Sequence, residues 1–137
     1  MKPTVVTRWT KKLAWKGLKI LDFGSGEKQI QTEYLQSHGL DVTPYDLHLN
    51  PEALDEAYNI IMVSNVINVQ PDLKHVRKVI RDVSNLLEDT CSFALVNYPK
   101  SPRKVDMGEK QLERELRKHF ADVTKLPDRT LVYRCSI

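Results

Sequence analysis

The chain has 137 residues, which suits one domain covering residues 1–137, and its 41% hydrophobic and 28% charged residues are typical of a soluble globular protein. No stretch approaches the roughly 20 apolar residues of a membrane span, and the N-terminus lacks the apolar core of a secretion signal, so we expect a cytoplasmic protein without membrane contact. The net charge of +3 permits contact with nucleic acid or another anion but does not predict it.

The first part of the chain alternates between helical periodicity and a short β run. Apolar residues at helical spacing predict a helix over 4–16, which Gly17 would end. A strand over 19–23 follows and stops at a glycine-rich turn. A second helix, over 28–37, is expected to begin directly after that turn with Ile30 on its inner face.

The middle of the chain contains two strands joined by a short connection. A strand is predicted over 41–45, and Pro44 within it favours an edge position because proline has no N–H to donate. About two turns of helix over 51–57 would start with Asn50 as its N-cap. The run 58–63 is the most apolar in the chain and predicts a central strand buried on both faces.

The last part completes an α/β pattern. A long helix over 72–88 is supported by apolar residues spaced three and four apart, and it leads to a buried strand over 91–97. A charged helix over 109–119 is followed by two strands, 122–125 and 130–136, that read as an antiparallel hairpin. Strand–helix alternation that ends in a hairpin predicts a mostly parallel sheet with a C-terminal antiparallel edge.

The turn after the first strand is the clearest candidate for a binding site. Gly24-Ser25-Gly26 allows a tight bend and a close approach of ligand to backbone, although a lone Gly-x-Gly is also a common structural turn. Asp46 follows twenty residues after Gly26, the spacing at which an acid accepts hydrogen bonds from ribose hydroxyls. The third glycine of Gly-x-Gly-x-x-Gly is absent. A ligand with ribose but no pyrophosphate therefore fits better than NAD.

These residues carry a resemblance to a known family. The run 19–26 resembles motif I of Rossmann-like S-adenosylmethionine-dependent methyltransferases, and the likeness continues through 43–46 and 58–69. The segment 65–69 is similar to methyltransferases associated with phosphorothioate DNA modification systems and to small phage methyltransferases. The resemblance implies a Rossmann-like three-layer sandwich and S-adenosylmethionine as cofactor. No metal is expected, because the two cysteines form no Cys-x-x-Cys pair and the four histidines are scattered.

The resemblance also implies roles for individual residues. The cofactor-binding residues would be Asp22, Gly24, Ser25, Gly26, Asp46, Leu47 and Ser64. Asp22 and the glycine backbone would hold the amino-acid half, Asp46 the ribose, and Leu47 would lie against adenine. Ser64 and Asn65 are the catalytic candidates that would face the sulfonium and the acceptor. Tyr98 is a third catalytic candidate, because by topology it lies beside the basic segment 100–104, past which an acceptor would approach. The structural alternative is a turn-capping role for Asp22 and a polar strand end for Ser64 and Asn65.

The sequence also departs from the family. Only residues 47–57 separate two strands, so the usual third strand is missing and the adenine side would be more open. Residues 64–67 replace the Asp/Asn-Pro-Pro-Tyr motif of amino-directed DNA methyltransferases, which argues against a base amino group as acceptor.

Cys91 and Cys135 are far apart and are expected to be two buried, reduced thiols.

Three functions are consistent with these features. The first is a methyltransferase that acts on a small molecule or nucleic acid. The second is a non-catalytic S-adenosylmethionine-binding module or subunit of a partner protein. The third is a nicotinamide-dependent oxidoreductase, which the incomplete glycine pattern disfavours. The basic segment 100–104 is either a site for an anionic substrate, such as a nucleic-acid backbone, or a solvated loop. The sequence determines neither the acceptor nor the oligomeric state.

Overall fold

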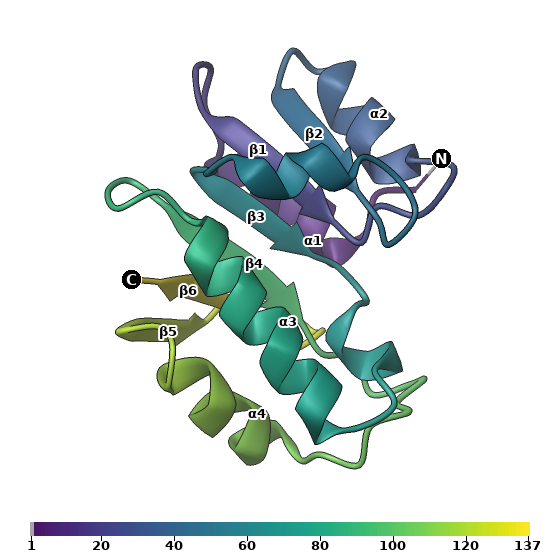
Figure 1. Cartoon of the computed structure of the whole chain (residues 1–137), viewed down its shortest axis with the longest axis vertical. Helices are drawn as coiled ribbons and strands as arrows, with labels where there is room; N and C mark the ends of the chain where they lie inside the picture. Colours follow the sequence, from purple (N-terminus) through teal and green to yellow (C-terminus); the bar gives the residue numbers. More distant parts are fainter. Residues whose placement is uncertain (1) are drawn as a thin grey trace.

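The computed structural model describes residues 2–137, which form one six-stranded sheet with helices on both faces (Figure 1). The strands are β1 (Lys19–Phe23), β2 (Asp41–Tyr45), β3 (Ile60–Val63), β4 (Phe93–Asn97), β5 (Asp122–Lys125) and β6 (Val132–Ser136). The helices are α1 (Val5–Leu13), α2 (Ile30–Gln36), α3 (Leu73–Leu86) and α4 (Glu109–Arg117), with short 3-10 helices η1 (Pro51–Asp55) and η2 (Ile67–Val69). The strand order is β2-β1-β3-β4-β6-β5.

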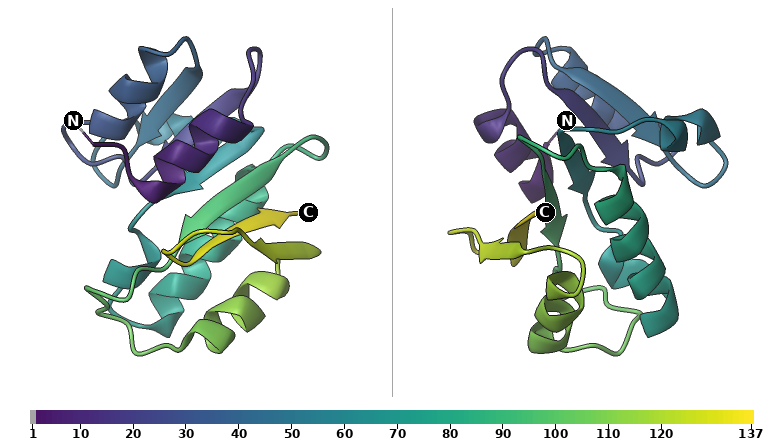
Figure 2. Two further views of the ribbon diagram at one scale, coloured as in Figure 1. Left: turned by 180° about the vertical axis from the view of Figure 1, so that it is seen from behind. Right: turned by 60° about the vertical axis from the view of Figure 1, so that its left-hand side comes forward.

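The predicted α/β architecture is confirmed. Strands β2, β1, β3 and β4 run parallel, whereas β6 runs antiparallel to both β4 and β5. Neighbouring residues along a strand face opposite sides, so Ile60 joins the core under α1 while Ile61 joins the core under α3. Helices α1 and α3 cover opposite faces of the sheet (Figure 2), which gives the three layers. Because β3 and β4 are covered on both sides, their sequences are apolar without alternation.

The predicted absence of the usual third strand is also confirmed. Strand β2 is the edge of the sheet, and within residues 2–137 the chain passes from β2 through η1 directly to β3. The expected helix over 51–57 is wrong, because Pro51–Asp55 is a 3-10 helix. Asn50 does not cap it as predicted: its backbone is left-handed (φ 58°) and its side chain makes no capping bond.

Side chains cover the outer edge of β2. The Tyr45 carbonyl accepts hydrogen bonds from the glycine turn on the β1 side, so the alternate residues Val42 and Pro44 direct their backbone groups outward. Gln36 donates its side-chain amide to the Val42 carbonyl at 2.9 Å, and Asn50 donates to the Pro44 carbonyl at 2.8 Å. The edge position that Pro44 predicted is therefore correct, and amide side chains occupy both outward carbonyls.

Two helix boundaries differ from prediction. Helix α1 ends before Gly17, because Ala14 is already extended (ψ 151°) and Gly17 lies in the following turn. Helix α2 begins at Ile30 and not directly after the glycine turn, because Gln29 has a left-handed backbone (φ 52°) that cannot belong to a right-handed helix. Ile30 is 43% exposed, so its predicted inward orientation is wrong.

The two cysteines have different environments. Cys135 is buried as predicted, and burial raises the pKa of its thiol to about 12. Cys91 is exposed, which corrects the prediction, because it lies in the turn before β4 with a left-handed backbone (φ 52°) and not within the strand. Residues 2–137 contain no cluster of metal-ligating side chains, and none of their helices is long and apolar enough to cross a bilayer.

Candidate functional site

The glycine turn is attached to the end of β2 by backbone hydrogen bonds. The Tyr45 carbonyl accepts from the Gly24 N–H at 2.8 Å and from the Ser25 N–H at 2.9 Å. The Gly26 N–H donates to Asp46 Oδ2 at 2.8 Å. All three amides of the turn are thus bonded within the protein, and the turn is ordered by β2 without a ligand.

The two glycines have positive φ for different structural reasons. Gly24 (φ 84°) lies against the loop after β3, so that a Cβ added to it would be 2.6 Å from Val66 Cγ2. Gly26 (φ 74°) faces open space, and a Cβ there would meet no atom within 4 Å. Gly24 therefore allows close packing of two loops, while Gly26 is needed only for its backbone conformation.

Asp46 links the turn to the rim of a cavity. Its Oδ2 accepts from Gly26, and its Oδ1 accepts from the backbone N–H of Leu47 at 2.7 Å. A carboxylate has about four acceptor positions, so each oxygen retains a lone pair for a further donor. Asp46 is only partly buried and lines the cavity, which makes those lone pairs accessible to a ligand hydroxyl.

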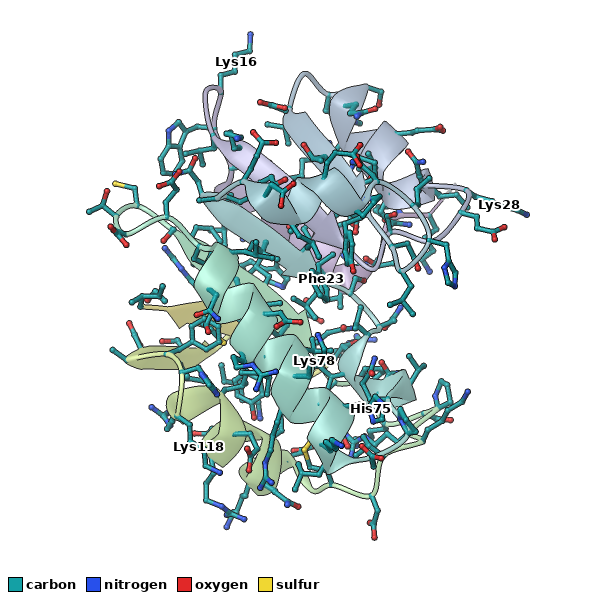
Figure 3. The ribbon with its side chains drawn as sticks, viewed as in Figure 1. Lys16, Phe23, Lys28, His75, Lys78 and Lys118 are labelled. Atoms are coloured by element: carbon teal, nitrogen blue, oxygen red, sulfur yellow. The ribbon has the colours of Figure 1, made fainter. Side chains whose placement is uncertain are left out.

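The cavity opens at the carboxyl ends of β1, β2 and β3 and has a volume of about 590 Å³, within the usual range for small-molecule sites. Its walls include Phe23 from β1 and, on the α3 side, His75 and Lys78 (Figure 3). Leu47 also lines it and is 79% exposed, although apolar. Sites at this edge are typical of open α/β sheets, and Leu47 offers an apolar surface for a ligand to cover.

A reciprocal amide pair fixes the wall of the cavity next to β3. Asn65 has a left-handed backbone (φ 56°) and donates its N–H to Asn97 Oδ1 at 2.7 Å. Asn97 is buried and returns a hydrogen bond to Asn65 Oδ1 at 2.8 Å. The sequence reasoning missed Asn97. The available signal was an asparagine at the end of the otherwise apolar strand β4.

The structure places the other two catalytic candidates outside this cavity. Ser64 donates its hydroxyl to Thr4 Oγ1 at 3.0 Å, at the N-terminus of α1. Tyr98 is fully buried, and its hydroxyl donates to the Met107 carbonyl at 2.6 Å. Of the three candidates, only Asn65 lines the cavity beside Asp46.

Asp22 lies beneath the glycine turn at the end of β1. It is buried, and its carboxylate accepts a hydrogen bond from the Thr32 hydroxyl at 2.7 Å. Burial raises the pKa of Asp22, the Thr32 bond opposes that rise, and the negative charge of Asp46 adds to it. A buried carboxylate with a neutral partner would be stabilised by a ligand cation.

We expect Asp22→Asn to stabilise the ligand-free protein at neutral pH. Because the folded-state pKa of Asp22 is raised, the wild type loses stability as pH rises from 3.8 through that higher value. The asparagine variant never carries this charge, so its unfolding midpoint at pH 8 should be higher by about 4 °C, the shift that roughly 1 kcal/mol produces in such a domain. Thermal unfolding from pH 4 to pH 8 measures this.

The same substitution at exposed Asp89 serves as the control and should change the midpoint little at any pH. A less stable Asp22→Asn variant at pH 8 would show that the Thr32 bond outweighs burial.

No family model matches the chain, and no curated protein matches it in sequence. Solved structures do match it. A TehB-like S-adenosylmethionine-dependent methyltransferase from Corynebacterium glutamicum is 15% identical, with a TM-score of 0.70 over 95% of this chain and 84% of that one. A methyltransferase from Bacteroides fragilis, in complex with S-adenosylhomocysteine, is 13% identical, with a TM-score of 0.70 over 99% of this chain and 79% of that one.

A third similar structure is the 1,6-didemethyltoxoflavin-N1-methyltransferase of Burkholderia thailandensis, which contains its substrate and S-adenosylhomocysteine. It is 16% identical, with a TM-score of 0.66 over 97% of this chain and 79% of that one. Together these likenesses show that the chain has the Rossmann-like fold of S-adenosylmethionine-dependent methyltransferases. This chain forms that fold with β2 as the edge strand.

Proposed function

We propose that residues 1–137 form a single S-adenosylmethionine-binding domain that transfers a methyl group to a small molecule or a nucleic acid. The observation that supports this best is the placement of Asp46. It anchors the glycine turn and borders the cavity at the carboxyl ends of β1, β2 and β3, in a chain with the methyltransferase fold. The free thiols Cys91 and Cys135 are consistent with a cytoplasmic setting.

Each part of the cofactor has a chemical counterpart in this site. Asp46 offers its remaining lone pairs to ribose hydroxyls, and Leu47 offers apolar surface to adenine. Asp22 provides negative charge for the ammonium of the amino-acid half, and it lies beneath the turn formed by Gly24, Ser25 and Gly26. That ammonium would balance a carboxylate that burial otherwise disfavours.

In methyl transfer, the main contribution of a protein is to position the acceptor. The sulfonium supplies an already activated methyl group, so the residues need to align an acceptor with it. Asn65 suits this role because Asn97 fixes both its backbone and its side chain at the cavity wall. Ser64 and Tyr98 flank Asn65 along the same sheet edge and are proposed to shape the approach of the acceptor.

The second candidate function is a binding module without turnover. It is favoured by the hydroxyls of Ser64 and Tyr98, which both donate to partners within the protein and not toward the cavity. Such a module would work as a subunit, and a partner protein would supply the acceptor site.

Calorimetric titration with S-adenosylmethionine, S-adenosylhomocysteine and NAD tests the cofactor assignment. The first two are expected to bind, and NAD is expected not to bind. Binding of NAD alone would contradict the proposal. Incubation with methyl-labelled cofactor and candidate acceptors then separates enzyme from module, since only the enzyme transfers label.

We expect Asn65→Ala to lower methyl transfer about tenfold or more while changing the Kd for S-adenosylhomocysteine less than about threefold, because positioning is what Asn65 would supply. Asn97→Ala should have the same effect, since it releases Asn65. Single-turnover rates and calorimetry measure the two quantities. Equal losses in rate and affinity would instead assign Asn65 to cofactor binding and not to positioning of the acceptor.

A further inference from the structure

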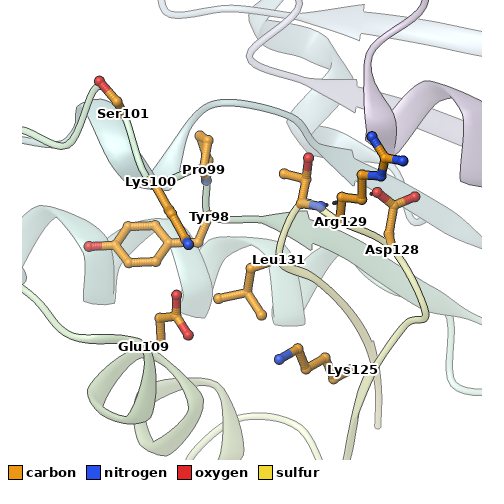
Figure 4. Close-up of a pocket in the computed structure, with 10 residues that line it drawn as sticks. Tyr98, Pro99, Lys100, Ser101, Glu109, Lys125, Asp128, Arg129 and Leu131 are labelled. Carbon is orange, nitrogen blue, oxygen red and sulfur yellow. Dashed lines mark hydrogen bonds between the residues drawn. The ribbon is translucent and has the colours of Figure 1, made fainter.

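A second cavity, of about 570 Å³, lies between the loop that follows β4 and the turn that joins β5 to β6 (Figure 4). Lys100 belongs to the loop, and Lys125 is the last residue of β5, so basic side chains reach the cavity from both walls. Arg129 lies at its rim. Pro99 and Leu131 contribute apolar surface between them.

The side chains that line this cavity carry three positive and two negative charges. Glu109 lies 3.5 Å from the Arg103 guanidinium, which balances its charge, whereas Asp128 accepts from the neutral Trp9 Nε1–H at 3.1 Å and keeps its own charge. Asp128 also accepts from a backbone N–H, and these hydrogen bonds lower its pKa. The three cations that line the cavity, Lys100, Lys125 and Arg129, form no ion pair with any residue among 2–137.

The cavity lies at the same end of the sheet as the cavity lined by Asp46 and Asn65. Tyr98 lines it and directly follows Asn97, whose side chain holds Asn65 in the wall of the first cavity. Strand β6 is antiparallel to β4, so the turn before β6 lies at the same end of the sheet as the carboxyl ends of β3 and β4. Both cavities therefore open at this end of the sheet, beside neighbouring strands.

We propose that this second cavity binds a small acceptor carrying a carboxylate or a phosphate, with Lys100 and Lys125 contacting the anion. Ammonium–anion hydrogen bonds are among the stronger ones in proteins, and Pro99 and Leu131 would cover an apolar part of the same molecule. The volume suits a small molecule and not a polymer that follows a surface groove. The role as acceptor rests on the proposed function, whereas anion binding does not.

Phenyl phosphate and benzoate, titrated against the full chain and followed by amide NMR shifts, test this site. Shifts are expected at 98–101 and 125–131, with no binding of neutral benzyl alcohol. Lys100→Ala and Lys125→Ala should each weaken phenyl phosphate about five- to tenfold, and the double variant should abolish it. Raising the salt concentration should weaken binding as well. Lys16→Ala is the control, because Lys16 is exposed at the tip of a remote loop (Figure 3).

Equal binding of benzyl alcohol, shifts at other residues, or lysine variants that bind like wild type would overturn the proposal. So would a single-stranded oligonucleotide that displaces phenyl phosphate and shifts residues well beyond the cavity, since it would identify a polymer site. S-adenosylmethionine is titrated in the same samples. If phenyl phosphate binds and S-adenosylmethionine does not, the anion site stands while the methyltransferase function fails; the opposite result rejects the anion site alone.

Discussion

Replacing Gly24 with alanine is expected to lower the free energy of unfolding by about 3 kcal/mol, from two independent costs. A left-handed backbone (φ 84°) costs a residue with a Cβ about 1–2 kcal/mol. The added Cβ would also lie 2.6 Å from Val66 Cγ2, and overpacking of this kind costs about 1–3 kcal/mol. Urea-induced unfolding measures the sum.

Gly26→Ala is the matched control for this prediction. Its φ of 74° carries the same backbone cost, but no atom lies within 4 Å of the added Cβ, so the loss should stay near 1–2 kcal/mol, about the backbone cost alone. Adding Val66→Ala to the Gly24→Ala variant should recover the packing part, because it removes the methyl group that collides. Equal losses at both glycines, with no recovery, would show that the loop contact does not matter.

Asp46→Ala is expected to weaken S-adenosylmethionine about 10- to 100-fold, since a hydrogen bond to a charged group contributes about 1.5–3 kcal/mol. The substitution removes the acceptor proposed for ribose and also releases the Gly26 N–H that orders the turn. Calorimetric titration measures the change. Asp55→Ala, in the exposed part of η1, removes the same charge nearby and should bind like wild type.

Asp46→Asn separates the two contributions of Asp46. An amide oxygen can still accept from Gly26 but carries no charge, so the affinity should fall between those of wild type and Asp46→Ala. If Asp46→Ala binds S-adenosylmethionine like wild type, the carboxylate serves only to hold the turn.

Local sequence patterns predicted the parts of the fold that depend on burial. Strand β3 and helix α3 were identified because apolar residues at a fixed period determine which face is covered. Three of the errors lie at residues with left-handed backbones, namely Gln29, Asn50 and Cys91. Non-glycine residues adopt this conformation only where surrounding contacts impose it, and those contacts are not visible in a local pattern.

The same distinction applies to the candidate site. Asp46 was found because it ends a strand at a recognisable distance from the glycine turn. The contact of Gly24 with Val66 and the pairing of Asn65 with Asn97 join neighbouring strands whose register the sequence does not specify. Tyr98 was grouped with Asn65 because both end adjacent strands, yet its ring belongs to the core and its hydroxyl is directed to Met107.

The covered edge of β2 explains how a sheet without the usual third strand can avoid pairing with strands of other chains. An uncovered edge presents free carbonyls and N–H groups that recruit strands from other chains, which leads to domain swapping or fibrils. Here Gln36 and Asn50 occupy the outward carbonyls of Val42 and Pro44, and the proline has no N–H to offer. Two side-chain amides and one proline thus block three of the four outward backbone positions at Val42 and Pro44 with which a strand from another chain could pair.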